Sequence, residues 1–399
     1  MGRRLVWTSL AVAVVSLALF LFRIGTPPAY IYDEGNYVRS ARTFLDGTAN
    51  TNPEHPPLAK IMIAGGMKIA GDNPFGWRIA GAVCGSLTLV AIFLWTYLLL
   101  FDYALALTAA LLTLFNNFLY VMSRVAMLDV FFFAFVMWGV LAFTAALKLE
   151  LPLWQRRGLM LASGLMFGLG GACKWTAVVT LAAVVLVAAV FFARNSYRIR
   201  ELGFSSLVLG LAVVPAVAYG LAYWPLFREL HQPFTLRGLM AMNSFIWIYH
   251  VNCPGNPALH VPWYDWFFRA TPERGLSYLM GNFVVVWGGL VALVICASRF
   301  LRNWASALPE GLVTLLYAIN LLQWLVIPQK RTCYYYYYPP AMFLGVALVI
   351  ALGRMKQPSI AGVRLGMVIT IAAAVFFLYC YPRMADLQAP FDCALGCWS

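Results

Sequence analysis

Charged residues are scarce in this sequence. Asp and Glu together number 15 of 399 residues, and all charged residues make up 11%, whereas soluble globular domains carry about 25%. The eight cysteines form no CxxC pair and no zinc-binding spacing, so no structural zinc site is predicted. A glycine-rich phosphate-binding loop is also absent, which argues against a P-loop enzyme. The composition excludes an ordinary soluble domain.

Long apolar runs make up most of the chain. Hydrophobic residues account for 62% of it, and the mean hydropathy is +0.78. Because a helix needs roughly 20 apolar residues to cross a bilayer, the runs predict an all-α polytopic membrane protein with about eleven spans. These are 5–23, 78–100, 103–119, 128–147, 158–173, 175–193, 204–224, 277–298, 310–328, 337–353 and 362–381. The first run follows Arg3 and Arg4 without a small-residue cleavage site after it, so we expect a retained anchor and not a signal peptide.

Basic residues predict the orientation of these spans. The short loops on the side of the N-terminus carry Arg3, Arg4, Lys148, Arg156, Arg157, Arg194, Arg198, Arg200, Arg299, Arg302, Arg354, Lys356 and Arg364. Short basic loops stay in the cytoplasm, so the N-terminus is predicted inside the plasma (inner) membrane and the C-terminus outside. The net charge of +13 follows from these loops. Because no separate basic domain exists, no nucleic-acid partner is predicted.

One membrane domain, residues 1–399, is expected, with two long loops on the external side. The first loop covers residues 24–77 and the second covers 225–276, and a C-terminal part of four spans, 277–399, completes the chain. No feature of the sequence indicates an oligomeric state.

Helical spacing recurs within the first external loop. Residues 36–46 place Tyr37 and Phe44 on one side, and residues 58–70 follow two prolines, which are well tolerated in a first helical turn. Both segments are predicted to be amphipathic helices that lie in the membrane interface.

The same loop carries acidic residues at both helix starts. Asp33 and Glu34 directly follow the first span, and Glu54 precedes His55. Acidic side chains favour helix N-termini, so capping is one interpretation of all three carboxylates. Capping does not require a vicinal pair, however, and this makes Asp33 and Glu34 candidates for chemistry.

Three ionisable residues lie at the ends of apolar spans, where burial in a bilayer would be energetically unfavourable. Arg124 and Asp129 occur in the segment SRVAMLDV at the external end of the fourth span, and Lys174 interrupts GLGGACKWTAVV between the fifth and sixth. Such residues are costly in a membrane and are usually functional or mutually paired. An Arg124–Asp129 ion pair is one interpretation, although a separation of five residues suits one helix face poorly. Ligand binding is the other.

Near the end of the chain, the segment PQKRTCYYYYYPP places Lys330 and Arg331 beside five tyrosines that include Tyr335. Tyrosines at a membrane boundary ordinarily form a belt at the level of the headgroups, but five in a row exceed that need. Cationic donors beside phenolic hydroxyls would suit a phosphate group at the outer leaflet.

The second external loop contains His250, His260 and Trp263 within an aromatic stretch. Aromatic side chains often anchor a loop in the interface, which is one interpretation. The other is that they wall an acceptor groove opposite Asp33.

Cysteine placement follows the predicted spans. Four cysteines are expected to be buried small apolar residues: Cys84, Cys173, Cys296 and Cys380. Cys393 and Cys397 lie in the external tail, where a disulfide with each other or with Cys253 is open if the compartment is oxidising.

Several motifs occur in an order known from one enzyme family. They are DE after the first span, HPPLAK, SRVAMLD, GGACKWT, MNSFIWIYH followed by PWYDW, GNFVVVW and RTCYYYYYP. The DE pair alone is weak evidence for a family, but the combination of DE with HPPL, CKW and PWYDW is specific. Over nearly its whole length the chain resembles protein O-mannosyltransferases. The resemblance implies a GT-C glycosyltransferase fold with eleven spans. The loop 225–276 has no room for the extra lumenal domain of eukaryotic members, so the chain looks like a short prokaryotic member.

The resemblance also implies a reaction and a set of site residues. The donor would be a polyprenyl-phosphate sugar, with mannose moving to a Ser or Thr hydroxyl of a secreted or membrane protein and inversion at the anomeric carbon. Asp33 would be the general base and Glu34 would orient Asp33 or the acceptor. Donor and phosphate candidates are Arg124, Asp129, Lys174, Lys330, Arg331 and Tyr335. Acceptor or sugar-site candidates are Glu54, His55, His250, His260 and Trp263. No metal or other cofactor is required, because cations hold a lipid phosphate as leaving group.

One departure from the family leaves the acceptor open. Glu54 directly precedes His55, whereas the family usually has its acid two places before the histidine, and related GT-C enzymes that modify lipid A have Glu directly before a similar PP run. A lipid or glycan acceptor is therefore the alternative. A transporter or flippase is disfavoured, because transporters place charges near the bilayer midplane and often consist of two related halves, and this sequence shows neither.

Overall fold

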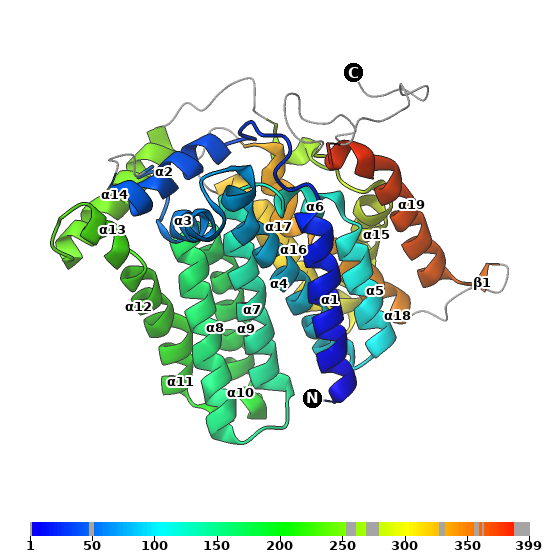
Figure 1. Ribbon diagram of the computed structural model, residues 1–399. Coiled ribbons are helices and arrows are strands. Elements are labelled where there is room, and N and C mark those ends of the chain that lie inside the picture. Colours follow the sequence, from blue (N-terminus) through cyan, green and yellow to red (C-terminus); the bar gives the residue numbers. More distant parts are fainter. Residues whose placement is uncertain are drawn as a thin grey trace.

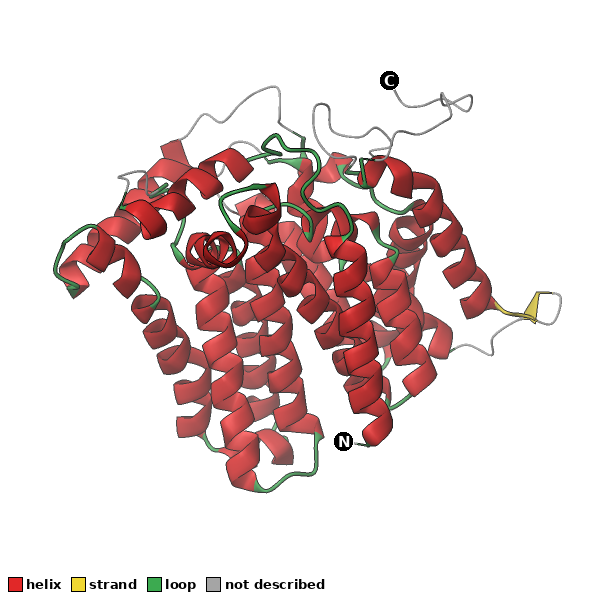
Figure 2. Ribbon diagram, in the orientation of Figure 1, coloured by secondary structure: helices red, strands yellow, loops and turns green. Residues whose placement is uncertain are grey.

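Helices make up most of the computed structural model, which describes residues 2–47, 52–252, 261–268, 279–326, 332–354, 359–360 and 363–386. Figures 1 and 2 show a bundle of long helices with shorter helices across its upper end. In these ranges the strands are the antiparallel pair β1 (Ser359–Ile360) and β2 (Val363–Arg364). The predicted all-α membrane fold is confirmed.

Eight helices or helix runs in the described ranges are long and apolar enough to cross a membrane. They are α1 (Arg3–Leu21), α4 (Pro74–Leu100), α7 (Leu128–Lys148), the run Phe204–Glu229, α15 (Phe283–Arg302), α16 (Leu308–Val326), the run Tyr334–Gly353 and α19 (Leu365–Met384). Three more helices overlap predicted spans: α5 (Tyr103–Leu114), α8 (Leu153–Cys173) and α9 (Ala177–Ala193). Every predicted run thus overlaps at least one described helix, and the number of eleven spans stays a prediction.

Two of the spanning runs are composite. The first consists of α11 (Phe204–Val208), the π-helix η1 (Leu209–Val213), α12 (Val214–Leu221) and α13 (Trp224–Glu229). The second consists of the 3₁₀ turn η4 (Tyr334–Tyr337), α17 (Tyr338–Ala341) and α18 (Leu344–Gly353). Short helices elsewhere are α6 (Asn117–Met122), α10 (Tyr197–Leu202) and η3 (Trp263–Asp265).

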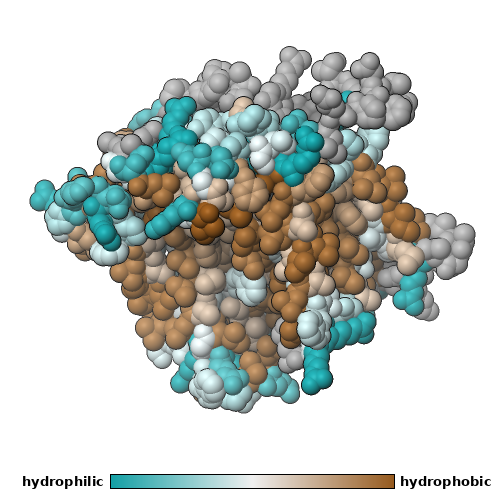
Figure 3. Space-filling view, viewed as in Figure 1, coloured by the Kyte–Doolittle hydropathy of each residue, from teal (hydrophilic) through white to brown (hydrophobic). Residues whose placement is uncertain are grey.

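Three helices lie at the end of the bundle opposite the N-terminus: α2 (Glu34–Asp46), α3 (Leu58–Ala70) and α14 (Leu236–Asn252) (Figure 1). The first two match the helices predicted over 36–46 and 58–70. Figure 3 shows hydrophobic residues in a belt around the middle of the visible face, with hydrophilic residues at its upper and lower ends. This division places α2 and α3 near the edge of the apolar belt, as expected of interfacial helices.

Side-chain caps fix where several helices begin. Asn73, Asp102 and Asn282 accept hydrogen bonds from first-turn N–H groups of α4, α5 and α15, which supplies partners that a helix start otherwise lacks. Asn282 also donates to the carbonyls of Phe115 and Ala373. It therefore ties the start of α15 to the end of α5 and to α19.

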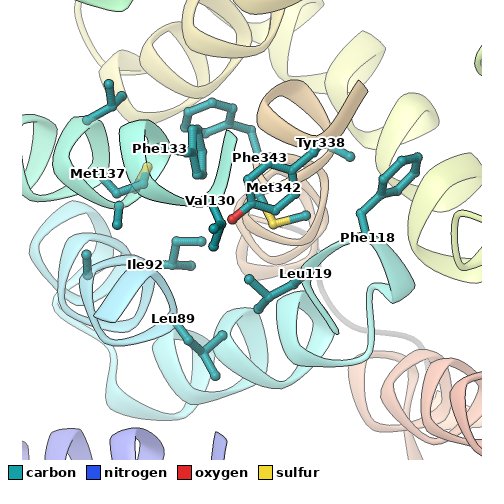
Figure 4. Packing of buried hydrophobic residues seen from close by; sticks show 14 of the residues in the cluster. Leu89, Ile92, Phe118, Leu119, Val130, Phe133, Met137, Tyr338, Met342 and Phe343 are labelled. Carbon is teal, nitrogen blue, oxygen red and sulfur yellow. The ribbon is translucent and has the colours of Figure 1, made fainter. Parts of the chain in front are cut away.

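Helix α7 lies at the centre of the packing and contacts α3, α4, α8, α9 and α17. Figure 4 shows side chains of α4, α6 and α7 converging with those of residues 338–343. The ring of Phe133 lies 5.4 Å from that of Tyr338 and 5.8 Å from that of Phe343, both edge-on, a favourable aromatic arrangement. The end of the tyrosine-rich segment is thus part of the core.

The four cysteines predicted to be buried are buried: Cys84, Cys173, Cys296 and Cys380. The other predicted disulfide partners, Cys253, Cys393 and Cys397, lie outside the described residues.

Helix α8 approaches the run Phe204–Glu229 unusually closely. A Cβ atom at Gly164 would lie 1.8 Å from the carbonyl oxygen of Gly210, and one at Gly168 would lie 2.5 Å from that of Pro215. Only glycine permits this contact, which is typical of helix pairs in membranes. It brings the end of α8 that adjoins Lys174 beside α12.

Candidate functional site

The tyrosine run, residues Tyr334–Tyr338, forms an internal wall of the molecule. Four of its side chains are buried and Tyr336 is partly buried. The indole of Trp324 on α16 stacks on Tyr336 with ring centroids 4.7 Å apart, and the hydroxyl of Tyr335 donates to Asp33 Oδ2 at 2.7 Å. The belt interpretation is wrong for this run, because its side chains pack between the loop of residues 24–77 and the helix bundle.

Asp33 occupies the position before α2 but does not cap it. Its carboxylate accepts no hydrogen bond from the first-turn N–H groups of the helix and instead faces Tyr335, and the capping interpretation is therefore wrong. The preceding Tyr32 has a φ of 53°, a left-handed conformation that costs a non-glycine residue roughly 1–2 kcal/mol. Such strain persists where the surrounding structure enforces it and gathers at functional sites. This turn aims Asp33 at the tyrosine run.

Glu34 points away from Asp33 into the protein. Its buried carboxylate pairs with Arg78, with Nε–Oε1 and Nη2–Oε2 distances of 2.8 Å each, and also accepts the N–H groups of Ile31 and Ala126. Glu34 does not cap α2, so that interpretation is wrong as well. Its contacts fix the loop one residue from Asp33, which makes Glu34 a supporting residue by geometry.

The partner of Glu34 was missed by sequence reasoning. Arg78 is fully buried and donates further hydrogen bonds to the carbonyls of Ile24, Pro27 and Ala29. A single guanidinium thereby organises the chain between α1 and α2. The sequence signal that could have identified Arg78 is an arginine at the start of an apolar span, since charged residues in such segments are usually functional or paired.

Arg124 has a similar role on the other side of this segment. Its guanidinium donates to the carbonyls of Phe20, Phe22 and Arg23 at the end of α1, and it does not pair with Asp129. The predicted Arg124–Asp129 ion pair is therefore wrong. Because its donors face backbone carbonyls, a phosphate contact by Arg124 stays a prediction that this geometry does not favour.

Asp129 pairs instead with Lys174, whose Nζ lies 2.8 and 2.9 Å from the two carboxylate oxygens. The same ammonium lies over the ring of Tyr336, 4.5 Å from its centroid, and 5.8 Å from that of Tyr335, within the range of a cation–π contact. Contacts thus run from Asp33 through Tyr335 to Lys174 and Asp129. Four of the predicted site residues come together here.

A cavity of about 620 Å³ opens beside this cluster. Its walls come from residues 55–56, the junction of α8 and α9, α12, the inner face of α14, the end of α16, and Tyr336. Apolar and aromatic side chains dominate, and Lys174 is the one Lys or Arg among the described residues that line it. Asp33 does not line the cavity and lies next to it, behind the tyrosine run.

His55 and His250 stand together in the cavity wall with ring centroids 5.0 Å apart. Burial, followed by the positive charge of Lys174, holds the pKa of His55 well below its usual range. Burial also lowers the pKa of His250, against the opposing effect of a hydrogen bond to the Glu54 carbonyl. Both rings are therefore neutral near pH 7. Neutral rings of this kind suit hydrogen bonding and packing more than anion binding.

Two of the remaining predicted residues, Glu54 and Trp263, are described and do not line the cavity. Glu54 Oε2 accepts from Asn52 Nδ2 at 2.7 Å, and the residue at the N-cap of α3 is Pro57, so Glu54 does not cap that helix. Trp263 lies in η3, partly buried, and does not line the cavity. Lys330, Arg331 and His260 lie outside the described residues, and their roles stay predictions.

Known proteins resemble the chain in both sequence and fold. Residues 54–224 match the family model described as dolichyl-phosphate-mannose-protein mannosyltransferase. A polyprenol-phosphate-mannose–protein mannosyltransferase of Mycolicibacterium smegmatis is 25% identical, over 87% of this chain and 81% of the relative. The enzyme of the same name from Corynebacterium glutamicum is 36% identical over 28% of this chain and 23% of its own length.

Solved structures share the fold at lower sequence identity. The S. cerevisiae protein O-mannosyltransferase Pmt1–Pmt2 complex, bound to the sugar donor, matches with a TM-score of 0.82 and 13% identity, covering 96% of this chain and 90% of that one. ArnT from Cupriavidus metallidurans, bound to undecaprenyl phosphate, matches with a TM-score of 0.62 and 18% identity, covering 98% and 67%. Family model, relatives and fold agree: residues 54–224 match the protein mannosyltransferase family model, and the chain has the fold of GT-C glycosyltransferases.

Proposed function

We propose that this protein moves mannose from a polyprenyl-phosphate donor to a Ser or Thr hydroxyl of secreted or membrane proteins, on the extracytoplasmic face of the plasma membrane. The names of the relatives supply the donor, the sugar and the protein acceptor. The observation that carries the proposal for this chain is an apolar cavity with one described cation, Lys174, linked through Tyr335 to the carboxylate of Asp33.

The chemistry follows from these positions. The donor phosphate would lie at Lys174 and the prenyl chain along the apolar walls of the cavity. As the acceptor oxygen forms its bond to the anomeric carbon, the carbon–oxygen bond to the phosphate breaks and lipid phosphate leaves. Asp33 takes the hydroxyl proton, and Lys174 stabilises the charge that develops on the phosphate. Attack from the side opposite the phosphate inverts the anomeric centre.

Transfer by the purified full-length chain tests this proposal. We expect polyprenyl-phosphate mannose and a Ser/Thr-rich peptide to yield a mannosylated peptide, detected by mass spectrometry. Labelling of a lipid or glycan in the same assay, with all peptides unmodified, would overturn the protein acceptor. Absence of transfer to every acceptor would overturn the donor assignment.

Replacing Lys174 by Gln is expected to raise the donor KM about ten- to hundredfold, since a hydrogen bond to a charged group contributes about 1.5–3 kcal/mol. Because the change also leaves Asp129 buried without its ion pair, the double variant Lys174→Gln/Asp129→Asn separates binding from folding. Initial rates at varied donor concentration measure the effect. Lys68→Gln, at an exposed site on α3, is the control. An unchanged donor KM would contradict the assignment of Lys174 and make Arg331 the candidate for the phosphate contact.

The orientation of the chain is part of the proposal. Figure 1 places α10 and the start of α1 at one end of the bundle and α2, α3 and α14 at the other, and the basic short loops predict that the first end is cytoplasmic. We therefore expect a membrane-impermeant thiol reagent to label Cys397 in intact cells. The variant Cys397→Ser gives the background. Labelling of Cys397 only after permeabilisation would reverse the orientation.

A further inference from the structure

The segment between α2 and α3 is held by side chains acting on its backbone. Lys60, buried on α3, donates from Nζ to the carbonyl of Asn52 at 2.6 Å and to that of His55 at 2.8 Å. Burial lowers the pKa of Lys60 to about 7, against the opposing charge of Glu54. Both the protonated and the neutral amine of Lys60 carry enough hydrogens to donate to the two carbonyls. One side of the segment is thus fixed to the helix that follows it.

The opposite side of the segment is held from a distant part of the chain. Nε2 of His250 lies 3.0 Å from the carbonyl oxygen of Glu54, so this nitrogen carries the hydrogen of the neutral ring. The His250 ring also packs against that of His55. Three carbonyls within four residues of the first external loop therefore accept from side chains, and one of the donors comes from the second external loop.

Helix α14, which carries His250, is largely exposed. Ile246 is its one buried residue, and large apolar side chains such as Met240 and Ile248 are exposed. Asn243 accepts a hydrogen bond from Tyr219 on α12. Asn243 and His250 are seven residues apart and thus share the face that lines the cavity. The hydrogen bond of His250 therefore joins the C-terminal half of α14 to the Glu54–His55 segment.

We propose that His250 is a positioning residue for sugar transfer, which joins α14 to the Glu54–His55 segment and thereby closes the cavity wall on the side of the first external loop. The inference rests on the function proposed above. His250 acts through the Glu54 carbonyl and the His55 ring. Without it, α14 and the segment can separate, and the donor in the cavity loses the wall that holds it in register with Asp33.

Two substitutions separate this role from general packing. His250→Leu removes the donor hydrogen and keeps an apolar side chain, whereas His250→Gln offers an N–H group at a similar reach. We expect His250→Leu to lower kcat/KM for the donor about three- to tenfold, the range for losing one neutral hydrogen bond, and His250→Gln to recover most of it. Asn252→Leu is the matched control, since that exposed amide donates to the carbonyl of Ile248 in its own helix.

Hydrogen exchange gives a second measurement that does not depend on activity. The amides of Glu54 and His55 should exchange faster in His250→Leu than in the wild type, and at the wild-type rate in His250→Gln and Asn252→Leu. Unchanged exchange in His250→Leu, or equal loss of kcat/KM in the Leu and Gln variants, would overturn the positioning role. Absence of transfer by the wild type would overturn the proposed function and the link to transfer, whereas the exchange comparison alone decides whether His250 joins α14 to the Glu54–His55 segment.

Discussion

Replacing Asp33 by Asn is expected to lower sugar transfer by about 10²- to 10⁴-fold, the usual contribution of a general base, with little change in the donor KM. An amide has the size of the carboxylate and can still accept the hydrogen bond from Tyr335, but it cannot take a proton from the acceptor hydroxyl at neutral pH. Because Asp33 does not cap α2, the substitution removes the proton acceptor and leaves the start of the helix intact.

Initial rates with saturating peptide and varied donor measure both parameters of Asp33→Asn. Asp46→Asn, the same change at the exposed end of α2, should retain wild-type transfer. Glu34→Gln should have a smaller effect on transfer than Asp33→Asn, because Glu34 supports the loop and takes no proton. Transfer by Asp33→Asn near the wild-type rate would contradict the assignment and make Glu54 the next candidate for the base.

The helices were largely predictable from the sequence because their causes are local. The segment predicted as a helix over 58–70 coincides with α3, since two prolines precede an apolar periodic run. The helix predicted over 36–46 starts two residues earlier as α2, a displacement usual at helix ends. The predicted spans correspond to helices because a bilayer demands long apolar runs. Hydropathy does not reveal the composite run Tyr334–Gly353, where a 3₁₀ turn of tyrosines precedes the helix.

The partners within the site were not predictable in the same way, because each pair joins distant parts of the chain. Lys174 and Asp129 are 45 residues apart, and the sequence offered Arg124 as the nearer partner for Asp129. His250 reaches the Glu54 carbonyl across 196 residues. A sequence shows that an ionisable group in an apolar segment needs a partner, and only the packing of helices decides which one it meets.

The Arg78–Glu34 ion pair was also not predictable from the sequence, and its loss is expected to have the largest effect on stability. Replacing Arg78 by Met is expected to destabilise the protein by about 3–5 kcal/mol, the cost of breaking a buried ion pair from one side. The carboxylate of Glu34 would remain buried, with the N–H groups of Ile31 and Ala126 as its remaining donors among the described residues. The carbonyls of the segment after α1 would lose their common partner as well.

Thermal unfolding of the purified protein in detergent, followed by circular dichroism, measures this loss. Arg39→Met, at an exposed site on α2, should unfold like the wild type. The double variant Arg78→Met/Glu34→Gln should regain part of the stability, because it removes the uncompensated charge. Arg78→Lys should regain little, since an ammonium cannot reproduce the two parallel hydrogen bonds of a guanidinium. A midpoint for Arg78→Met equal to that of Arg39→Met would show that the Arg78–Glu34 pair does not hold the loop that presents Asp33.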